Sequence, residues 1–289
     1  MSLIIKLVDL ILYSNLWIAL GAASMVWQMQ ILAGTVFWPS ALAAFIFFST
    51  LFIYAMHRVI GFSIIDRTIP NRRLEIITTF QSHIVIYAAI AALGLILSAY
   101  FINLRTLLLF IPAAVISALY ISPLFKKKRL RDLPHIKIFL IAMVWSWITT
   151  CIPLIVESSF SGIQIGIIGL EKFLFVLTIT LPFDIRDMQV DDLHQVQTIP
   201  LRIGRHKTRT WISILLISIF MVIVLAFFLN VYSIPQTTGL LVFYIVLNSL
   251  IQLALNRDHD YYYSGLLDGT FLLQFLFVLL FTQLSSLMS

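Results

Sequence analysis

The chain has 289 residues, of which 61% are hydrophobic and only 11% are charged. A soluble globular domain carries about 25% charged residues, so this sequence has too little polarity to cover a surface that faces water. The net charge of +6 would suit a nucleic-acid partner, but the positions of the basic residues explain that charge without one. The composition indicates a polytopic helical membrane protein.

Apolar runs recur along the whole chain, and a membrane-spanning helix needs about 20 residues of this kind. We predict an all-helical bundle of about nine spans that forms a single domain over residues 1–289. Glu171 and Lys172 interrupt the sixth span, so its limits and those of the fifth are the least sharply drawn. The spans are 9–32, 36–56, 83–102, 105–123, 137–156, 166–183, 210–231, 236–255 and 264–285.

The basic residues lie almost entirely on one side of this predicted topology. If the N-terminus is cytoplasmic, the loops 57–82, 124–137, 184–209 and 256–263 lie on its side, and with Lys6 they hold 17 of the 19 lysines and arginines. Only Arg105 and Lys172 fall on the far side. Such an excess of cytoplasmic positive charge is typical of membrane proteins. We therefore predict a cytoplasmic N-terminus and cytoplasmic loops after the second, fourth and sixth spans.

Aspartates gather where the sixth span ends, in the stretch DIRDMQVDD (184–192). If this stretch is helical, the spacing i, i+3, i+7 places Asp184, Asp187 and Asp191 within one narrow arc. Clustered carboxylates keep their charges only when a cation lies between them, and Mg²⁺ typically bridges one or two carboxylates to the phosphates of a substrate. The alternative is a solvated helix end that carries surface acids. We favour a metal site for a phosphorylated substrate.

A basic segment, YISPLFKKKRLRDLPHIK (120–137), follows the fourth span and holds six positive charges within residues 126–137. A diphosphate would use two or three of them, because arginine offers bidentate contacts and lysine a point charge. Anionic lipid headgroups also attract such clusters, at about 1 kcal/mol per basic residue. Both interpretations of this segment stay open.

The stretch DIRDMQVDD and the QVQTIPLRIGRHKT that follows it (195–208) resemble the second aspartate-rich motif of the UbiA superfamily of intramembrane prenyltransferases. The basic segment is similar to the Tyr-Ser and basic region between the two motifs of that family. Nine spans with cytoplasmic loops after the second, fourth and sixth also fit, so the resemblance covers essentially the whole chain. It implies a UbiA-like bundle with a central cavity that opens to the cytoplasm.

The resemblance implies an enzyme that moves an isoprenyl group from a polyprenyl diphosphate to a lipophilic acceptor, with Mg²⁺ as cofactor and membrane lipid around it. Asp184, Asp187 and Asp191 would hold the metal and act in catalysis. The residues that would bind the diphosphate are Lys126, Lys127, Arg129 and Arg58. Metal and basic side chains would stabilise the charge that develops on the leaving diphosphate. The resemblance also suggests a bacterial inner membrane as the location.

The region of the first aspartate motif departs from the family pattern. It reads YAMHRVIGFSIIDRTIPNRR (54–73), in which Asp66 is the only acid, and His57 and Arg58 stand near the expected ligands. His57 and Arg58 could contact the diphosphate directly, Asp66 could reach the site from a bent loop, or the chain could keep the fold without the chemistry. The simpler alternative for His57 and Arg58 is an interfacial pair, with Arg58 extending toward lipid headgroups.

Two further residues are candidates for an acceptor pocket: Tyr120 at the end of the fourth span and Asp268 within the ninth. An acid inside a membrane span is a functional candidate by default, although Asp268 could instead cap a neighbouring helix. The second functional class that the sequence permits is a non-catalytic, transport or lipid-binding protein on the same scaffold. The paired broken helices of transporters are not evident in the sequence.

Overall fold

The computed structural model describes residues 8–12, 14–35, 38–62, 81–122, 129–193, 196–257 and 259–288. Within these ranges the regular elements are helices, and no strand occurs. The first half holds α2 (Leu16–Leu32), α3 (Ala41–Phe62), α5 (Gln81–Tyr100), α6 (Leu104–Leu109), α7 (Ile111–Ile121), the short η1 (Leu130–Asp132), α8 (Lys137–Ser146), the π-helix η2 (Trp147–Cys151) and α9 (Ile152–Glu157). The second half holds α10 (Gly162–Arg186), α11 (Met188–Leu193), α12 (Ile199–Phe228), α13 (Ile234–Leu255), the π-helix η3 (Tyr261–Leu267) and α14 (Thr270–Met288).

Seven helical segments of the described residues are long and apolar enough to cross a membrane. Two shorter apolar helices, Leu16–Leu32 and Ile84–Tyr100, lie where the first and third spans are predicted. Lipid offers no hydrogen bonds to a backbone, so a spanning segment must satisfy its own peptide groups, which a helix does. The predicted all-helical membrane bundle is therefore confirmed.

Local sequence marks several helix starts. Ser161 and Gln164 form a capping box at the start of α10. The backbone N–H of Ser161 donates to Gln164 Oε1 at 2.9 Å, and the backbone N–H of Gln164 donates to Ser161 Oγ at 3.4 Å. Pro200 and Pro235 stand in the first turns of α12 and α13, where proline has no helical hydrogen bond to lose. These signals begin the helices that carry the second half of the bundle.

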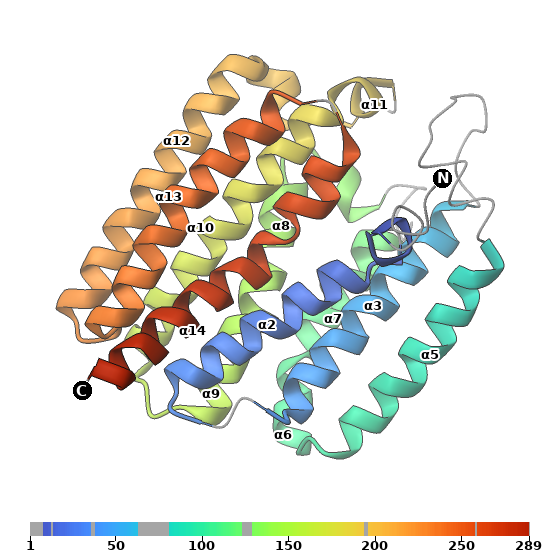
Figure 1. Ribbon diagram of the computed structural model, residues 1–289. Helices are drawn as coiled ribbons and strands as arrows, with labels where there is room; N and C mark the ends of the chain where they lie inside the picture. Colours follow the sequence, from blue (N-terminus) through green and yellow to red (C-terminus); the bar gives the residue numbers. More distant parts are fainter. Residues whose placement is uncertain are drawn as a thin grey trace.

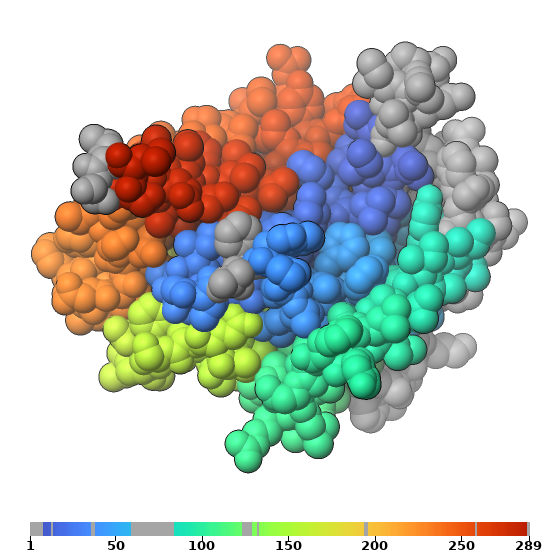
Figure 2. Space-filling view, turned by 60° about the horizontal axis from the view of Figure 1, so that its bottom comes forward, coloured from blue at the N-terminus to red at the C-terminus, as the bar shows by residue number. Residues whose placement is uncertain are grey.

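The helices shown in Figure 1 contact one another in an order that closes into a ring. Around the ring, α3 contacts α2, α2 contacts α14, and the order continues through α13, α12, α10, α8 and α7, which returns to α3. Helix α5 packs against α3 from outside the ring. Figure 2 shows one end of the molecule, where α2 and α3, in blue, lie between α14, in red, and α5, in teal.

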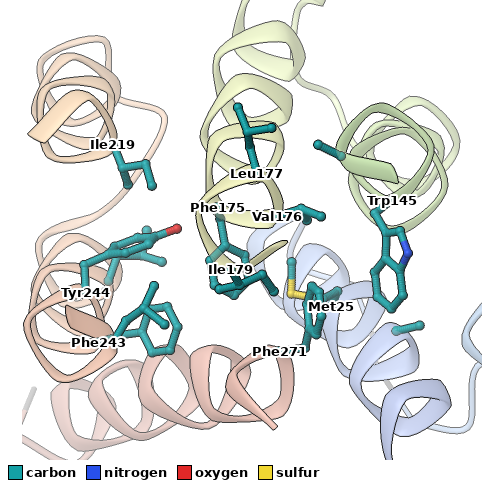
Figure 3. Close-up of a cluster of buried hydrophobic side chains, with 14 of the residues drawn as sticks. Met25, Trp145, Phe175, Val176, Leu177, Ile179, Ile219, Phe243, Tyr244 and Phe271 are labelled. Carbon is teal, nitrogen blue, oxygen red and sulfur yellow. The ribbon is translucent and has the colours of Figure 1, made fainter. Parts of the chain in front are cut away.

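Aromatic side chains fill the part of the ring between α10, α13 and α14 (Figure 3). Phe175 on α10 contacts Phe243 and Phe271 edge-on, with ring centroids 5.6 and 5.3 Å apart. Trp145 on α8 stacks on Phe271 at 4.5 Å. Such pairs stabilise the packing by about 0.5–1.5 kcal/mol beyond the burial of their area. Trp145 lies at the border of this packed region, because it also lines the two cavities described below.

Several helices differ from the predicted spans. Helix α3 ends at Phe62 and not at 56, so His57 and Arg58 lie in a helix and the predicted loop 57–82 begins too early. Helix α10 begins earlier and ends later than residues 166–183, so it includes Asp184 and buries Glu171 and Lys172 completely. Placing Lys172 among the far-side charges was therefore wrong, because its ammonium is paired with Glu171 inside the bundle at 3.0 Å. Helix α12 begins at Ile199 instead of 210 and bends at Gly204, whose φ of 84° suits a residue without a Cβ.

Candidate functional site

The ends of α8, α10 and α11 bring three charged side chains together. Asp184 lies in the last turn of α10, Asp191 lies on the short helix α11, and Lys137 is the first residue of α8. Lys137 Nζ donates to Asp184 Oδ1 at 2.8 Å and lies 3.7 Å from Asp191 Oδ2. The two carboxylates thus face one ammonium group. The predicted single helix over 184–192 is wrong, because α10 ends at Arg186 and α11 begins at Met188. We call Lys137, Asp184 and Asp191 the acid cluster.

The acid cluster is shielded from solvent. Asp184 and Asp191 are 3% and 6% exposed. Burial raises the pKa of the Asp191 carboxyl above its ordinary value, and the positive charge of Lys137 offsets part of that rise. Asp191 Oδ2 accepts no hydrogen bond from the part of the chain that the structure describes. A buried carboxylate oxygen without a donor is costly, so the cluster has capacity for a further cation or donor.

The Asp187 side chain pairs with Arg186 and not with Lys137, unlike those of Asp184 and Asp191. It caps the C-terminal end of α10, and both of its carboxylate oxygens accept from Arg186, at 2.7 and 3.1 Å. Arg186 also donates to Asp260 at 2.8 Å and lies over the rings of Phe183 and Tyr263. Arg186 therefore links the end of α10 to the start of η3 and neutralises Asp187 locally.

Positive and aromatic side chains form a second wall near the acid cluster. Arg131 in η1 lies 2.7 Å from His57 Nε2 on α3, and its guanidinium lies 5.5 Å from the centre of the Tyr120 ring. Arg131 is close enough to interact electrostatically with Asp184 and Asp191. Its buried Nε has no hydrogen-bond partner among the described residues. This wall thus presents an unsatisfied cationic donor.

Two adjoining cavities extend from the wall into the membrane region between α3, α7 and α8. The smaller has a volume of about 190 Å³ and is lined by His57, Tyr120 and Arg131 together with mostly apolar side chains. The larger, of about 440 Å³, shares Tyr54 and Trp145 with it and is otherwise almost entirely apolar. Together they make a site with a charged head and an apolar interior.

The carboxylate oxygens of Asp184 and Asp191 and their negative charge suit a magnesium ion. Mg²⁺ prefers carboxylate oxygens and keeps several waters, and Asp191 Oδ2 is an unused buried acceptor beside Asp184. No group of three His, Cys, Asp or Glu side chains arranged to hold a metal occurs among the described residues. The reason is visible in the ion pairs, since Lys137 lies between two carboxylates and Arg186 engages the third.

The remaining predicted site residues are distributed as follows. Arg58 donates to Asn15 Oδ1 at 2.7 Å, at the start of α2. Arg129 precedes η1 and interacts electrostatically with Tyr120. Asp268 ends η3, near enough to Arg186 to interact with its charge, and is not among the residues that line the two cavities. Lys126, Lys127 and Asp66 lie outside the described residues.

Lys137 and Arg131 were noted in the sequence only as members of a basic run. No local pattern distinguishes either from the four other basic residues of 126–137, because their role depends on where α8 and η1 meet α10 and α3. Asp260 belongs to a loop with no predicted role, and its contact with Arg186 spans 74 positions of sequence. A contact of this range has no sequence signal in a single chain.

Comparison with known proteins places this arrangement in a family. The model of the UbiA prenyltransferase family matches residues 63–263. The chain belongs to the UbiA prenyltransferase family. A search of curated proteins found no match to the sequence.

Solved structures of UbiA homologues share the fold. A UbiA homologue from Aeropyrum pernix K1, in its apo form, is similar with a TM-score of 0.65 at 14% identity, over 95% of this chain and 97% of that one. A UbiA homologue from Archaeoglobus fulgidus, bound to GPP and Mg²⁺, has a TM-score of 0.60 at 16% identity, over 93% and 98%. A structure of digeranylgeranylglyceryl phosphate synthase has a TM-score of 0.57 at 16% identity, over 93% and 95%. At these identities the likeness establishes the UbiA fold.

Proposed function

We propose that this UbiA-family protein is a magnesium-dependent intramembrane prenyltransferase that moves an isoprenyl group from a polyprenyl diphosphate to a lipophilic acceptor. The observation that carries the proposal is that Arg131 lies near the acid cluster and also lines an apolar cavity. Arg131 interacts electrostatically with Asp184 and Asp191, and together with His57 it lines the smaller cavity. A ligand that needs both a metal and fixed positive charge, and that has a long apolar tail, matches these surroundings.

Each part of the substrate has counterparts in the chain. Asp184, Asp191 and, once it leaves Arg186, Asp187 would hold Mg²⁺, which supplies positive charge to the leaving diphosphate. Arg131 and Arg129 would bind diphosphate oxygens opposite the metal, with guanidinium groups suited to bidentate contacts. Lys126 and Lys127 belong to the same segment and remain predicted members of this anion site.

Fixed positive charge on the α3 side replaces the acids that other family members carry in their first motif. His57 is held against Arg131 and would orient that guanidinium toward the diphosphate. Arg58 would act on the substrate only after release from Asn15. We infer that a single metal position, paired with Arg131, suffices here. The predicted alternative route, in which Asp66 enters from the loop, remains a prediction.

The apolar cavity would receive the prenyl tail and keep water from the allylic cation after the diphosphate departs. The rings of Tyr54, Tyr120 and Trp145 line the cavity, and aromatic faces attract a cation within about 6 Å of the ring centre. Exclusion of water prevents the cation from being hydrolysed. The acceptor would meet it beside Tyr120, with Asp268 kept as a predicted contributor.

The proposal places the protein in a bacterial inner membrane as one domain, with the site open to the cytoplasm. The distribution of lysine and arginine supports this orientation. Labelling of single cysteines, introduced at residues 192 and 103 of a Cys151→Ser protein in intact cells, tests it. A cysteine at 192 that an impermeant reagent reaches from outside would contradict the orientation.

The deciding experiment is binding and turnover of geranylgeranyl diphosphate by purified protein, with and without Mg²⁺. Asp184→Asn is expected to abolish Mg²⁺-dependent binding, because it removes a buried ligand. Asp192→Asn is the matched control, since it neutralises an exposed acid on the adjacent helix. Binding that is indifferent to Mg²⁺ and to Asp184 would overturn the transferase proposal. Mg²⁺-dependent binding with no turnover of any lipophilic acceptor would favour a non-catalytic or lipid-binding protein on the same scaffold.

A further inference from the structure

Lys137 occupies the place between two buried carboxylates where a metal ion would be expected. Its ammonium is 2.8 Å from Asp184 Oδ1 and 3.7 Å from Asp191 Oδ2, and its side chain is only 14% exposed. Two carboxylates that face one position in a buried site repel each other unless a cation lies between them. Lys137 therefore supplies from the chain itself the charge that a bound metal would bring.

The fit between Lys137 and the two aspartates is incomplete. Asp184 receives a hydrogen bond from Lys137, whereas Asp191 Oδ2 has an ion-pair distance but no hydrogen-bond donor within the described residues. The Asp191 side chain is 9% exposed, so water satisfies it poorly. A buried carboxylate oxygen aimed at the cation position and left without a donor indicates that a second occupant uses this position.

We propose that Lys137 is a tethered counter-cation that competes with divalent metal for Asp184 and Asp191, so that metal binds strongly only together with a diphosphate. A metal ion that arrives alone finds its two carboxylate ligands, Asp184 and Asp191, already paired with the Lys137 ammonium group. A diphosphate that enters with the metal offers the displaced ammonium a new anionic partner. This inference rests on the metal-binding part of the proposed function and adds a reason for joint binding of metal and diphosphate.

The surroundings of the Lys137 ammonium favour its displacement by a metal ion over a permanent pairing with Asp184 and Asp191. Lys137 begins α8, and its long side chain reaches the aspartates from outside their helices, so it can swing without moving α10 or α11. Arg131 lies near enough to Asp184 and Asp191 to interact with their charges, and its Nε lacks a hydrogen-bond partner in the described part of the chain. An anion between Arg131 and the displaced Lys137 would satisfy both cations.

Binding of Mn²⁺, followed by electron paramagnetic resonance of the free ion, tests the competition. The proteins are wild type, Lys137→Gln, which keeps a hydrogen-bond donor for Asp184 but removes the charge, and Lys207→Gln, which removes an exposed charge. Lys137→Gln should bind Mn²⁺ about 10- to 100-fold more tightly than wild type, in the range of ordinary coupling between sites. Lys207→Gln should match wild type. Equal Mn²⁺ affinities of wild type and Lys137→Gln would overturn the proposal.

Thermal unfolding separates competition from a structural ion pair. Lys137→Gln should have a lower Tm than wild type without metal, and saturating Mn²⁺ should raise its Tm by more than it raises that of wild type, because only the variant gains a missing cation. A loss of stability that Mn²⁺ does not restore would mean that Lys137 is structural, and would refute the proposal.

Calorimetry with inorganic pyrophosphate tests the joint binding. Mn²⁺ should strengthen pyrophosphate binding at least about fivefold more in wild type than in Lys137→Gln, because only wild type has an ammonium to release. An equal gain in the two proteins would overturn the joint-binding step. Absence of Mn²⁺ binding to both proteins, with or without pyrophosphate, would refute the metal part of the proposed function as well, so the two failures are distinguishable.

Discussion

Replacement of Lys172 by methionine is expected to destabilise the bundle strongly. Lys172 and Glu171 are fully buried in α10, with Lys172 Nζ 3.0 Å from Glu171 Oε2 and 2.6 Å from Gln274 Oε1 of α14. Tyr244 of α13 donates to Glu171, and Gln274 Nε2 donates to Tyr244 at 2.9 Å. Three helices thus share one polar network in the bundle interior.

The size of the effect follows from which charge is left behind. Methionine matches the length of the lysine stem but leaves the Glu171 carboxylate without its cation. Removal of one partner from a buried pair costs about 3–5 kcal/mol, whereas replacement of both partners by apolar groups is often neutral. We therefore expect Lys172→Met to lose about 3–5 kcal/mol of unfolding free energy, and Glu171→Gln with Lys172→Met to recover most of that loss.

Equilibrium unfolding in mixed detergent micelles, followed by helical circular dichroism, provides the measurement. Lys207→Met is the control, because an exposed lysine should change the free energy of unfolding by no more than about 0.5 kcal/mol. The reasoning is refuted if Lys172→Met loses less than about 1 kcal/mol, or if the double substitution is as damaging as the single one. Either result would mean that water or protonation satisfies Glu171 without Lys172.

Three further predictions concern the cavity and its walls. Arg131→Ala should weaken pyrophosphate binding about 10- to 100-fold in calorimetry, because a hydrogen bond to a charged group contributes about 1.5–3 kcal/mol, and an unchanged affinity would remove Arg131 from the anion site. Ala113→Leu narrows the larger cavity. It should weaken the binding of geranylgeranyl diphosphate at least about tenfold and leave the binding of dimethylallyl diphosphate nearly unaffected. Equal effects on the two diphosphates would contradict a binding site for the prenyl tail in this cavity. Gly239→Leu should lower unfolding free energy by about 1–3 kcal/mol, since its Cβ would meet the Phe277 carbonyl oxygen at 3.0 Å, whereas Gly166→Leu, with open space around it, should be tolerated.

Much of the architecture can be predicted from the sequence. Apolar runs of sufficient length located the bundle helices, since a spanning helix needs a minimum length and an apolar surface. The ends of the helices were less predictable. The sequence predicts a loop over 184–209, whereas Asp184 lies in α10 and α12 begins at Ile199. Charged residues suggest a helix end in a membrane protein, yet a charge that finds a buried partner lets the helix continue.

The grouping of Asp184, Asp187 and Asp191 within eight residues is a property of the sequence alone, as is the concentration of positive charge in 126–137. The predicted common face holds for Asp184 and Asp191, whereas Asp187 lies at the break between α10 and α11 and pairs with Arg186. The pairing of these groups was decided only in three dimensions. Lys137 reaches Asp184 across 47 positions and Arg131 reaches His57 across 74. Helical periodicity relates residues within one or two turns, whereas contacts between helices depend on how the whole ring closes. For that reason the sequence could predict acids and bases in one site, and only the tertiary structure shows that a lysine stands between the acids.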